Sequence, residues 1–240
     1  MGNGMHSVTS LALAQPHHDP LHARPRDLSR SESPPQDPLV DLWEHLIRGR
    51  LQPTSEGLAG DSICFLAQIT HGSALGPDDA SLLMNVLCGE ARKALASDLG
   101  IAVSTTTGRY LRALTKLHLS DCTTPLTVVL AAQSRSGLVR IPDARSKLVH
   151  HDGHSSLSVT VPRPLLECAA VLTPVQQQVA EWLIEGHSRD TIAERRATSP
   201  NTVAGQVHGI FRALRVTGRY ALIRRACELG CFGQLVKNVA

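Results

Sequence analysis

Side chains that can bond phosphates and base edges gather around residue 200 of this 240-residue chain. The sequence has seven arginines and neither Asp nor Glu between Arg195 and Arg225. Hydroxyl, amide, imidazole and guanidinium groups are those that proteins use on phosphates and base edges, and a positive field releases the counterions of a polyanion. Since the net charge of the whole chain is only +3, the positive charge depends on local clustering. This segment is therefore predicted to contact duplex DNA. The candidate contacts are Ser188, Arg189, Asn201, Thr202, Ala204, Gln206, His208, Arg212 and Arg219.

Four helices are expected to position these residues between Leu172 and Leu229. Thr173 and Pro174 begin the first helix, and Gln176 completes a capping box. Gly186 ends that helix, Ser188 can cap the second, and Ser199-Pro200 begins the third. Two short helices joined by a tight turn present the outer face of the second to a major groove. The apolar residues recur at helical spacing and are expected to face inward: Val175, Val179, Trp182, Leu183, Ile192, Ala193, Val203, Val207, Ile210, Phe211, Leu214, Leu222, Ile223, Ala226 and Leu229.

An internal repeat appears when the chain is shifted by 97 residues without a gap. Leu75-Gly-Pro77 then falls on Leu172-Thr-Pro174, and Gly89 falls on Gly186. The register holds over about 50 residues, which indicates a second, diverged four-helix unit. Its charge is balanced, with five basic and five acidic residues from Leu75 to Val129. This unit either contacts DNA weakly or packs against the second copy, and its candidate secondary DNA contacts are Lys93, Thr105, Arg109, Arg112 and Lys116.

The rest of the chain separates these two units. Ser62 to Ile69 is a short β-rich run, and Asp152-Gly153 between two further β-rich runs predicts a hairpin. The histidines near the start of the chain and around the hairpin are interpreted as solvated residues in preference to metal ligands. The expected organisation is a disordered tail at 1–37, a helix with a short β segment at 38–74, a diverged helix-turn-helix copy at 75–131, a linker with a hairpin at 132–167 and a helix-turn-helix domain at 168–233.

Several classes of protein are not expected. No apolar run reaches the roughly 18 residues of a membrane span, and the N-terminus lacks the pattern of a signal peptide. The six cysteines form no CxxC pair or disulfide framework, so free thiols and a cytoplasmic location are expected. No nucleophile, P-loop or zinc-protease signature occurs, so no catalytic residue, metal site or cofactor is predicted.

Residues 172 to 225 resemble the LuxR-type helix-turn-helix domain. Its opening Leu-Thr-Pro matches Leu172-Thr173-Pro174, and its helix-ending Gly matches Gly186. The remaining matches are the pair Ile192-Ala193, the run Ser199 to Val203, the stretch Phe211-Arg212-Ala213-Leu214, and Arg219. The resemblance implies a four-helix fold and transcriptional regulation, with the third helix reading DNA and the fourth often supporting dimers. Residues 75 to 129 resemble a second, diverged copy.

The sequence departs from the family pattern at informative positions. Val175-Gln176 replaces the usual Arg-Glu, Ala204 replaces a lysine just after Thr-Val, and Ala213 replaces a later lysine. In the first copy, Ala102 and Thr106 replace the Ser and the Val, while Lys116 keeps the late lysine. Residues 1–74 are too few for the receiver or autoinducer-binding domain that family members often carry.

The expected fold class is mainly α, with two four-helix helix-turn-helix units and a few short β-strands or a hairpin between and before them. The expected partner is double-stranded DNA. A homodimer, an intramolecular pseudo-dimer and contact with RNA polymerase are further candidates. The alternative function is a non-enzymatic protein-interaction module whose helical units dock onto another regulator or RNA polymerase.

Overall fold

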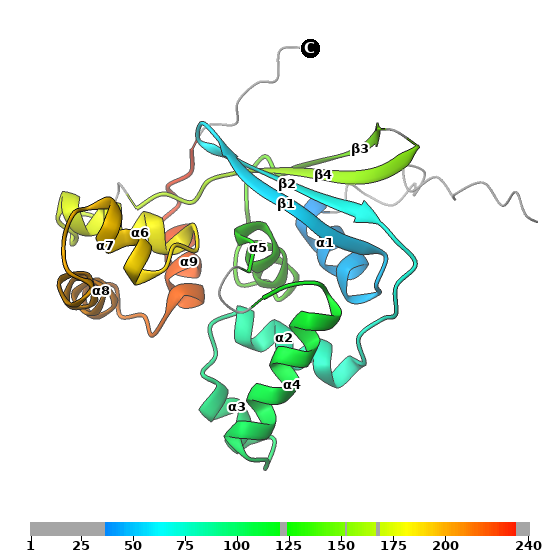
Figure 1. Ribbon diagram of the computed structural model, residues 1–240, viewed down its shortest axis with the longest axis horizontal. Helices are drawn as coiled ribbons and strands as arrows, with labels where there is room; N and C mark the ends of the chain where they lie inside the picture. Colours follow the sequence, from blue (N-terminus) through cyan, green and yellow to red (C-terminus); the bar gives the residue numbers. More distant parts are fainter. Residues whose placement is uncertain (1–36, 121–123, 152, 167–168, 234–240) are drawn as a thin grey trace, which may run out of the picture. The chain divides into compact units, whose positions relative to one another are not determined.

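The structure is a computed structural model, and it describes residues 37–120, 124–151, 153–166 and 169–233 (Figure 1). The tail predicted at 1–37 lies outside the described residues except for Asp37, whose carboxylate accepts from the Leu39 backbone N–H at 2.9 Å and caps the first helix. The elements in chain order are α1 (Pro38–Ile47), β1 (Leu51–Ala59), β2 (Ser62–Ile69), α2 (Pro77–Leu87), α3 (Arg92–Asp98), α4 (Val103–Lys116), α5 (Leu126–Arg135), β3 (Arg145–His151), β4 (His154–Pro162), α6 (Pro174–Ile184), α7 (Arg189–Arg195), α8 (Pro200–Leu214) and α9 (Arg219–Glu228).

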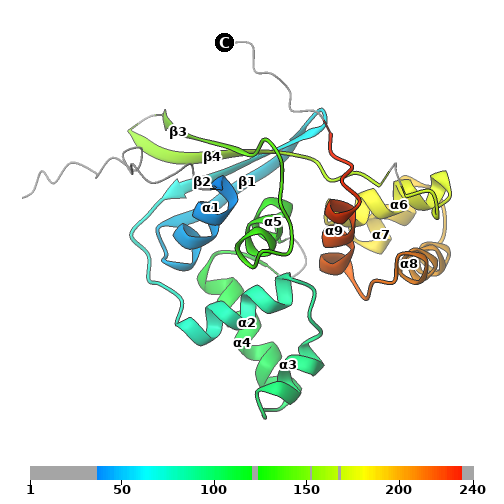
Figure 2. The same cartoon turned by 180° about the vertical axis from the view of Figure 1, so that it is seen from behind.

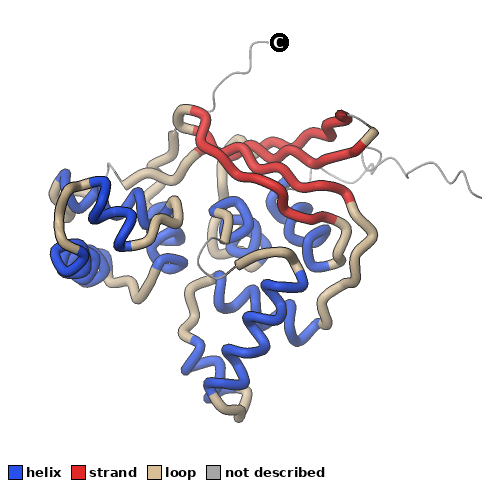
Figure 3. The backbone as a smooth tube through the Cα atoms, in the orientation of Figure 1, coloured by secondary structure: helices blue, strands red, loops and turns tan. Residues whose placement is uncertain are grey.

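The four strands form one antiparallel sheet in the order β1-β2-β4-β3 (Figure 3). The predicted strand at 62–69 is present as β2, and the predicted hairpin is present as β3 and β4, which pair from His151↔His154 to Arg145↔Thr160. The expected linker hairpin is not an isolated feature, because β4 also pairs with β2 along its length. Strand β1 was not expected. It contains Pro53 and Gly57, which are rare within strands and are tolerated here because β1 lies at the sheet edge.

Helices α1 and α5 lie against one face of this sheet (Figures 1 and 2). The face alternates as a half-buried sheet must, with Phe65 and Ala67 of β2 fully buried beside Val159 and Val161 of β4. Helix α5 is buried on all sides, because every residue from Leu126 to Ser134 is buried. It is therefore the central helix of this part of the chain, in contact with both α1 and α2.

Helices α2 to α4 lie between the two hairpins of the sheet in sequence. Their first residues are Pro77, Arg92 and Val103, and α6, α7 and α8 each begin 97 residues later. Gly89 and Gly186 follow the first helix of each segment with positive φ angles of 95° and 93°, a conformation that favours glycine. The spacing found in the sequence is thus also the spacing of the helix starts.

Two expectations from the sequence need correction. The strands are not a few short separate pieces, because they have seven to nine residues each and make one sheet. Cys231 is disulfide-bonded, so the expectation of free thiols is wrong for this residue, whereas Cys64, Cys88 and Cys227 are free. Burial raises the pKa of the Cys227 thiol to about 12. None of the helices in the described part of the chain has the length and apolar character needed to cross a lipid bilayer.

Candidate nucleic-acid interface

The α7–α8 pair has the cap residues that its sequence predicted. The Ser188 hydroxyl accepts from the Thr191 N–H at 3.1 Å, and the Ser199 hydroxyl accepts from the Thr202 N–H at 3.1 Å. Each cap satisfies a backbone donor that the first turn of a helix would leave unbonded. The inner faces are anchored by fully buried Ile192 of α7 and Val203 of α8. The turn between them is fixed at both ends, so the outer face of α8 has a defined direction.

That outer face is a polar stripe open to solvent. Asn201, His208 and Arg212 are all exposed and follow one another at seven and four residues along α8. Residues at this spacing lie on one side of a helix, so the three side chains span about 16 Å of it. Thr202 is exposed at the N-terminal end of the same helix, and Arg189 is exposed at the start of α7. The arrangement brings amide, imidazole and guanidinium groups to one exposed side of α8.

The centre of the stripe is occupied by small residues, and the neighbouring Gln206 side chain is bonded to α7 on another side of the helix. Ala204 is half-buried and carries no polar group, and Gly205 is exposed with open space around it. The Gln206 side chain accepts a hydrogen bond from the Arg196 guanidinium, which links α8 to the end of α7. The sequence identifies Arg196 only as one member of the arginine cluster between Arg195 and Arg225. This hydrogen bond holds the Arg196 guanidinium beside α8 and occupies the side-chain oxygen of Gln206.

Arg219 has a different role from the one predicted. Its guanidinium does not face the stripe but donates to three backbone carbonyls: Leu183 O at 3.0 Å, Ile184 O at 2.9 Å and Thr124 O at 3.0 Å. The first two carbonyls end α6, where the helix dipole favours a cation. Burial lowers the pKa of Arg219, although an arginine remains charged in any protein environment. The expectation that Arg219 contacts DNA is therefore corrected, because its donors are directed into the protein.

Other basic residues extend the positive surface beside the stripe. Arg195 is exposed on α7, with its guanidinium 5.9 Å from the centre of the Trp182 ring. Arg215 is exposed directly after α8, where it has a left-handed backbone with φ 55°. By contrast, Arg225 of α9 is paired with Glu228 at 3.0 Å. Among the described residues, no acidic partner pairs with Arg189, Arg195, Arg212 or Arg215, and Arg196 also keeps its charge because its partner Gln206 is a neutral amide.

The surface of α3 and α4 that carries the predicted secondary DNA contacts is only partly basic. Arg109 is paired with Asp79 at 2.8 Å, and the Lys116 ammonium donates to Ala74 O at 2.7 Å. Lys93, Thr105 and Arg112 remain exposed. Large apolar side chains are also exposed on these two helices and the turn between them, namely Leu99, Val103 and Leu111. The five predicted secondary contacts therefore do not form one continuous basic face.

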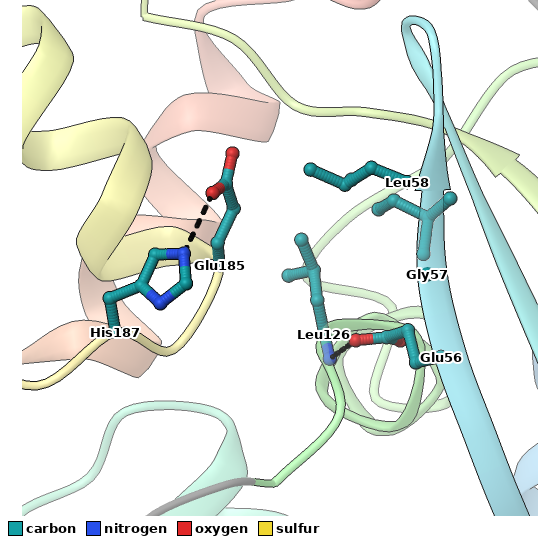
Figure 4. Close-up of a pocket in the computed structure, with 7 residues that line it drawn as sticks. Glu56, Gly57, Leu58, Leu126, Glu185 and His187 are labelled. Carbon is teal, nitrogen blue, oxygen red and sulfur yellow. Dashed lines mark hydrogen bonds and ion pairs between the residues drawn. The ribbon is translucent and has the colours of Figure 1, made fainter. Parts of the chain in front are cut away.

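A cavity of about 200 Å³ lies between β1, the start of α5 and the end of α6 (Figure 4). Glu56 uses both carboxylate oxygens to accept from the Leu126 and Thr127 N–H groups at 2.7 Å, and so caps α5. Glu185 forms an ion pair with Arg163, and its second carboxylate oxygen lies 3.3 Å from His187 Nε2. These acids are occupied by structural partners. Among the described residues, no group of three or more His, Cys, Asp or Glu could hold a metal ion.

Comparison of the chain with curated proteins and with solved structures finds no match. Residues 170–226 match the model of the GerE family, described as bacterial regulatory proteins of the luxR family, so the segment with the capped α7–α8 pair is similar to the DNA-binding helix-turn-helix domain of transcription regulators.

Proposed function

We propose that the chain is a transcription regulator that reads duplex DNA by placing α8 in the major groove. The observation that carries this proposal is the exposed stripe of Asn201, His208 and Arg212, held by a capped turn among free arginines. The match of residues 170–226 supports DNA-binding transcription regulation in general. Asn201 and His208 are the candidate base-reading residues, since amides and imidazoles donate and accept at base edges. Arg189, Arg212 and Thr202 are assigned to phosphates.

The proposal is tested by selecting duplexes that the full chain retains from a random library, followed by fluorescence anisotropy at several salt concentrations. We expect enrichment of a defined sequence and an affinity that falls steeply with salt. Replacing Asn201 by Ala should relax the sequence preference at one position, whereas Arg212→Ala should weaken binding to all sequences and reduce the salt slope by about one. Retention of all sequences equally, with both variants unchanged, would contradict this assignment.

We further propose that residues 75–131 are a diverged copy of the same unit, which the common 97-residue spacing of helix starts supports. Two units in one chain could act as an intramolecular pseudo-dimer on unequal half-sites. The matched variants Arg112→Ala on α4 and Arg212→Ala on α8 test this. A pseudo-dimer requires both to reduce affinity and the salt slope, whereas an effect of Arg212→Ala alone excludes DNA contact by the first copy at Arg112.

A second candidate function for the first copy is protein docking, because Leu99, Val103 and Leu111 are exposed apolar side chains near a weakly basic face. Exposed apolar groups of this kind favour protein partners over phosphates. RNA polymerase is the proposed partner, because a transcription regulator bound to DNA acts on this enzyme. A pull-down with purified RNA polymerase in the absence of DNA tests it. Capture that is lost with Val103→Asp and kept with Ala94→Asp supports docking, and equal capture of both variants contradicts it.

A further inference from the structure

Helix α9 is joined by polar contacts to helices that lie about a hundred residues earlier in the chain. Arg219, at its first position, bonds the end of α6 through Ile184 O and also donates to Thr124 O, two residues before α5. One guanidinium thus ties the DNA-binding segment to the chain that precedes α5. Hydrogen bonds from a charged donor are stronger than those from a neutral donor, so this is a strong polar contact.

The next residue, Tyr220, continues the same joint. Its hydroxyl lies 3.1 Å from the hydroxyl of Tyr110 on α4 and 3.5 Å from that of Thr124. Its backbone carbonyl accepts from the Gln133 side chain of α5 at 3.0 Å, and the same Gln133 amide bonds Leu87 O at the end of α2 at 2.9 Å. Gln133 is fully buried, so these bonds are sheltered from water. We call the contacts of Arg219, Tyr220, Tyr110, Thr124 and Gln133 the α9 joint.

Close backbone packing adds to the joint. A Cβ atom built on Gly89, after α2, would lie 3.1 Å from the Ala221 backbone N and 3.2 Å from its Cβ. Ala221 is buried on α9 and α5 contacts α9 directly. Two residues with little or no side chain therefore let α9 approach the end of α2 closely. The joint is both hydrogen-bonded and closely packed.

The joint continues toward the sheet through α5. Glu56 of β1 caps α5 at Leu126 and Thr127, two and three residues after Thr124, the loop residue that Arg219 bonds. Figure 4 shows Glu56 reaching the start of α5 from β1, across the cavity from Glu185 and His187 at the end of α6. The edge strand and the DNA-binding segment thus each bond to the short stretch from Thr124 to Thr127 at the start of α5.

We propose that α9 is seated on α4, α5 and the end of α2 of its own chain, and that this closed joint is the form that binds DNA. The inference rests on the proposed function for its DNA part. Asn201, His208 and Arg212 are exposed while the joint is closed, so the joint leaves the DNA-reading stripe uncovered.

The sequence offers a direct test, because Tyr110 and Tyr220 are the only two tyrosines in the chain. Photo-oxidation with tris-bipyridyl ruthenium and persulfate removes one electron and one proton from each of two neighbouring tyrosines, and the two radicals join through their ortho carbons while persulfate is reduced to sulfate; the two hydroxyls lie 3.1 Å apart here. We expect dityrosine fluorescence in a product that migrates as a single chain. Tyr110→Phe and Tyr220→Phe, treated identically, should give none. Absence of dityrosine, or dityrosine confined to a product of twice the mass, would overturn the seating of α9 on its own chain.

The same product tests the DNA part. The cross-linked chain should bind a selected duplex within about twofold of the Tyr110→Phe chain exposed to the same illumination, since α8 is already free. A loss of tenfold or more in the cross-linked chain alone would show that the joint has to open for DNA. The cross-link is read without DNA, so it decides where α9 sits even if neither chain binds a duplex and the proposed function fails.

Discussion

Replacing Arg219 by methionine separates a structural role from a DNA-contacting role. Methionine keeps an unbranched stem but removes every donor. The guanidinium bonds Leu183 O, Ile184 O and Thr124 O at 2.9 to 3.0 Å, and hydrogen bonds from a charged donor contribute about 1.5–3 kcal/mol each in favourable cases. Because Leu183 O and Ile184 O share one guanidinium edge and the residue keeps a small exposure to water, we count the three bonds as about two. The expected loss of unfolding free energy is about 3 kcal/mol.

Urea unfolding followed by circular dichroism measures this loss, and anisotropy against salt measures the DNA role. Arg219→Met should unfold at lower urea yet keep the salt slope of DNA binding, measured where the variant is folded. Arg212→Met is the matched control, since Arg212 is exposed on α8. It should keep the urea midpoint and lose about one unit of salt slope. A stable Arg219→Met chain with a reduced salt slope would refute the assignment of Arg219 to the interior.

Three further changes have expected outcomes. Ala204→Lys should raise DNA affinity and steepen the salt slope by about one, since it adds a cation at the centre of the stripe; an unchanged slope in anisotropy would place Ala204 away from phosphate. Ser199→Ala should cost about 1 kcal/mol in urea unfolding because it removes the cap of α8, and a loss below about 0.3 would mean that the cap contributes little. Burial lowers the pKa of His45, and its Nδ1 is buried without a partner, so its unfolded form binds protons more readily. Stability should therefore fall as pH drops below about 6.5, and His45→Gln should flatten that dependence between pH 7.5 and 5.5; parallel pH curves for the two chains would exclude His45 as the cause.

The helices that carry the exposed stripe of α8 could be predicted because their determinants are local. Thr173 with Gln176 forms the predicted capping box, and Ser188 and Ser199 cap α7 and α8 at the predicted residues. Serine or threonine followed by an apolar period of 3.6 identifies a helix start without knowledge of the rest of the chain. The direction of the α8 stripe follows from the same period.

What could not be predicted depends on contacts between distant segments. Strand β1 carries exposed polar residues with Pro53 and Gly57, and it is a strand because β2 lies beside it. Arg219 is a residue of the type that contacts DNA. Only the position of Thr124, 95 residues earlier, shows that its guanidinium bonds a backbone carbonyl within the protein. The disulfide of Cys231 likewise has no local pattern. Side-chain type indicated the possible chemistry, and packing decided which groups remain free for it.

The central claim is that α8 reads duplex DNA, and the salt dependence of binding to a duplex selected from a random library tests it most directly. The account predicts that the logarithm of affinity falls linearly with the logarithm of salt, and that combined Asn201→Ala and His208→Ala removes the preference for the selected sequence over a scrambled one. Binding that does not change with salt, or a sequence preference that survives this double substitution, would contradict it.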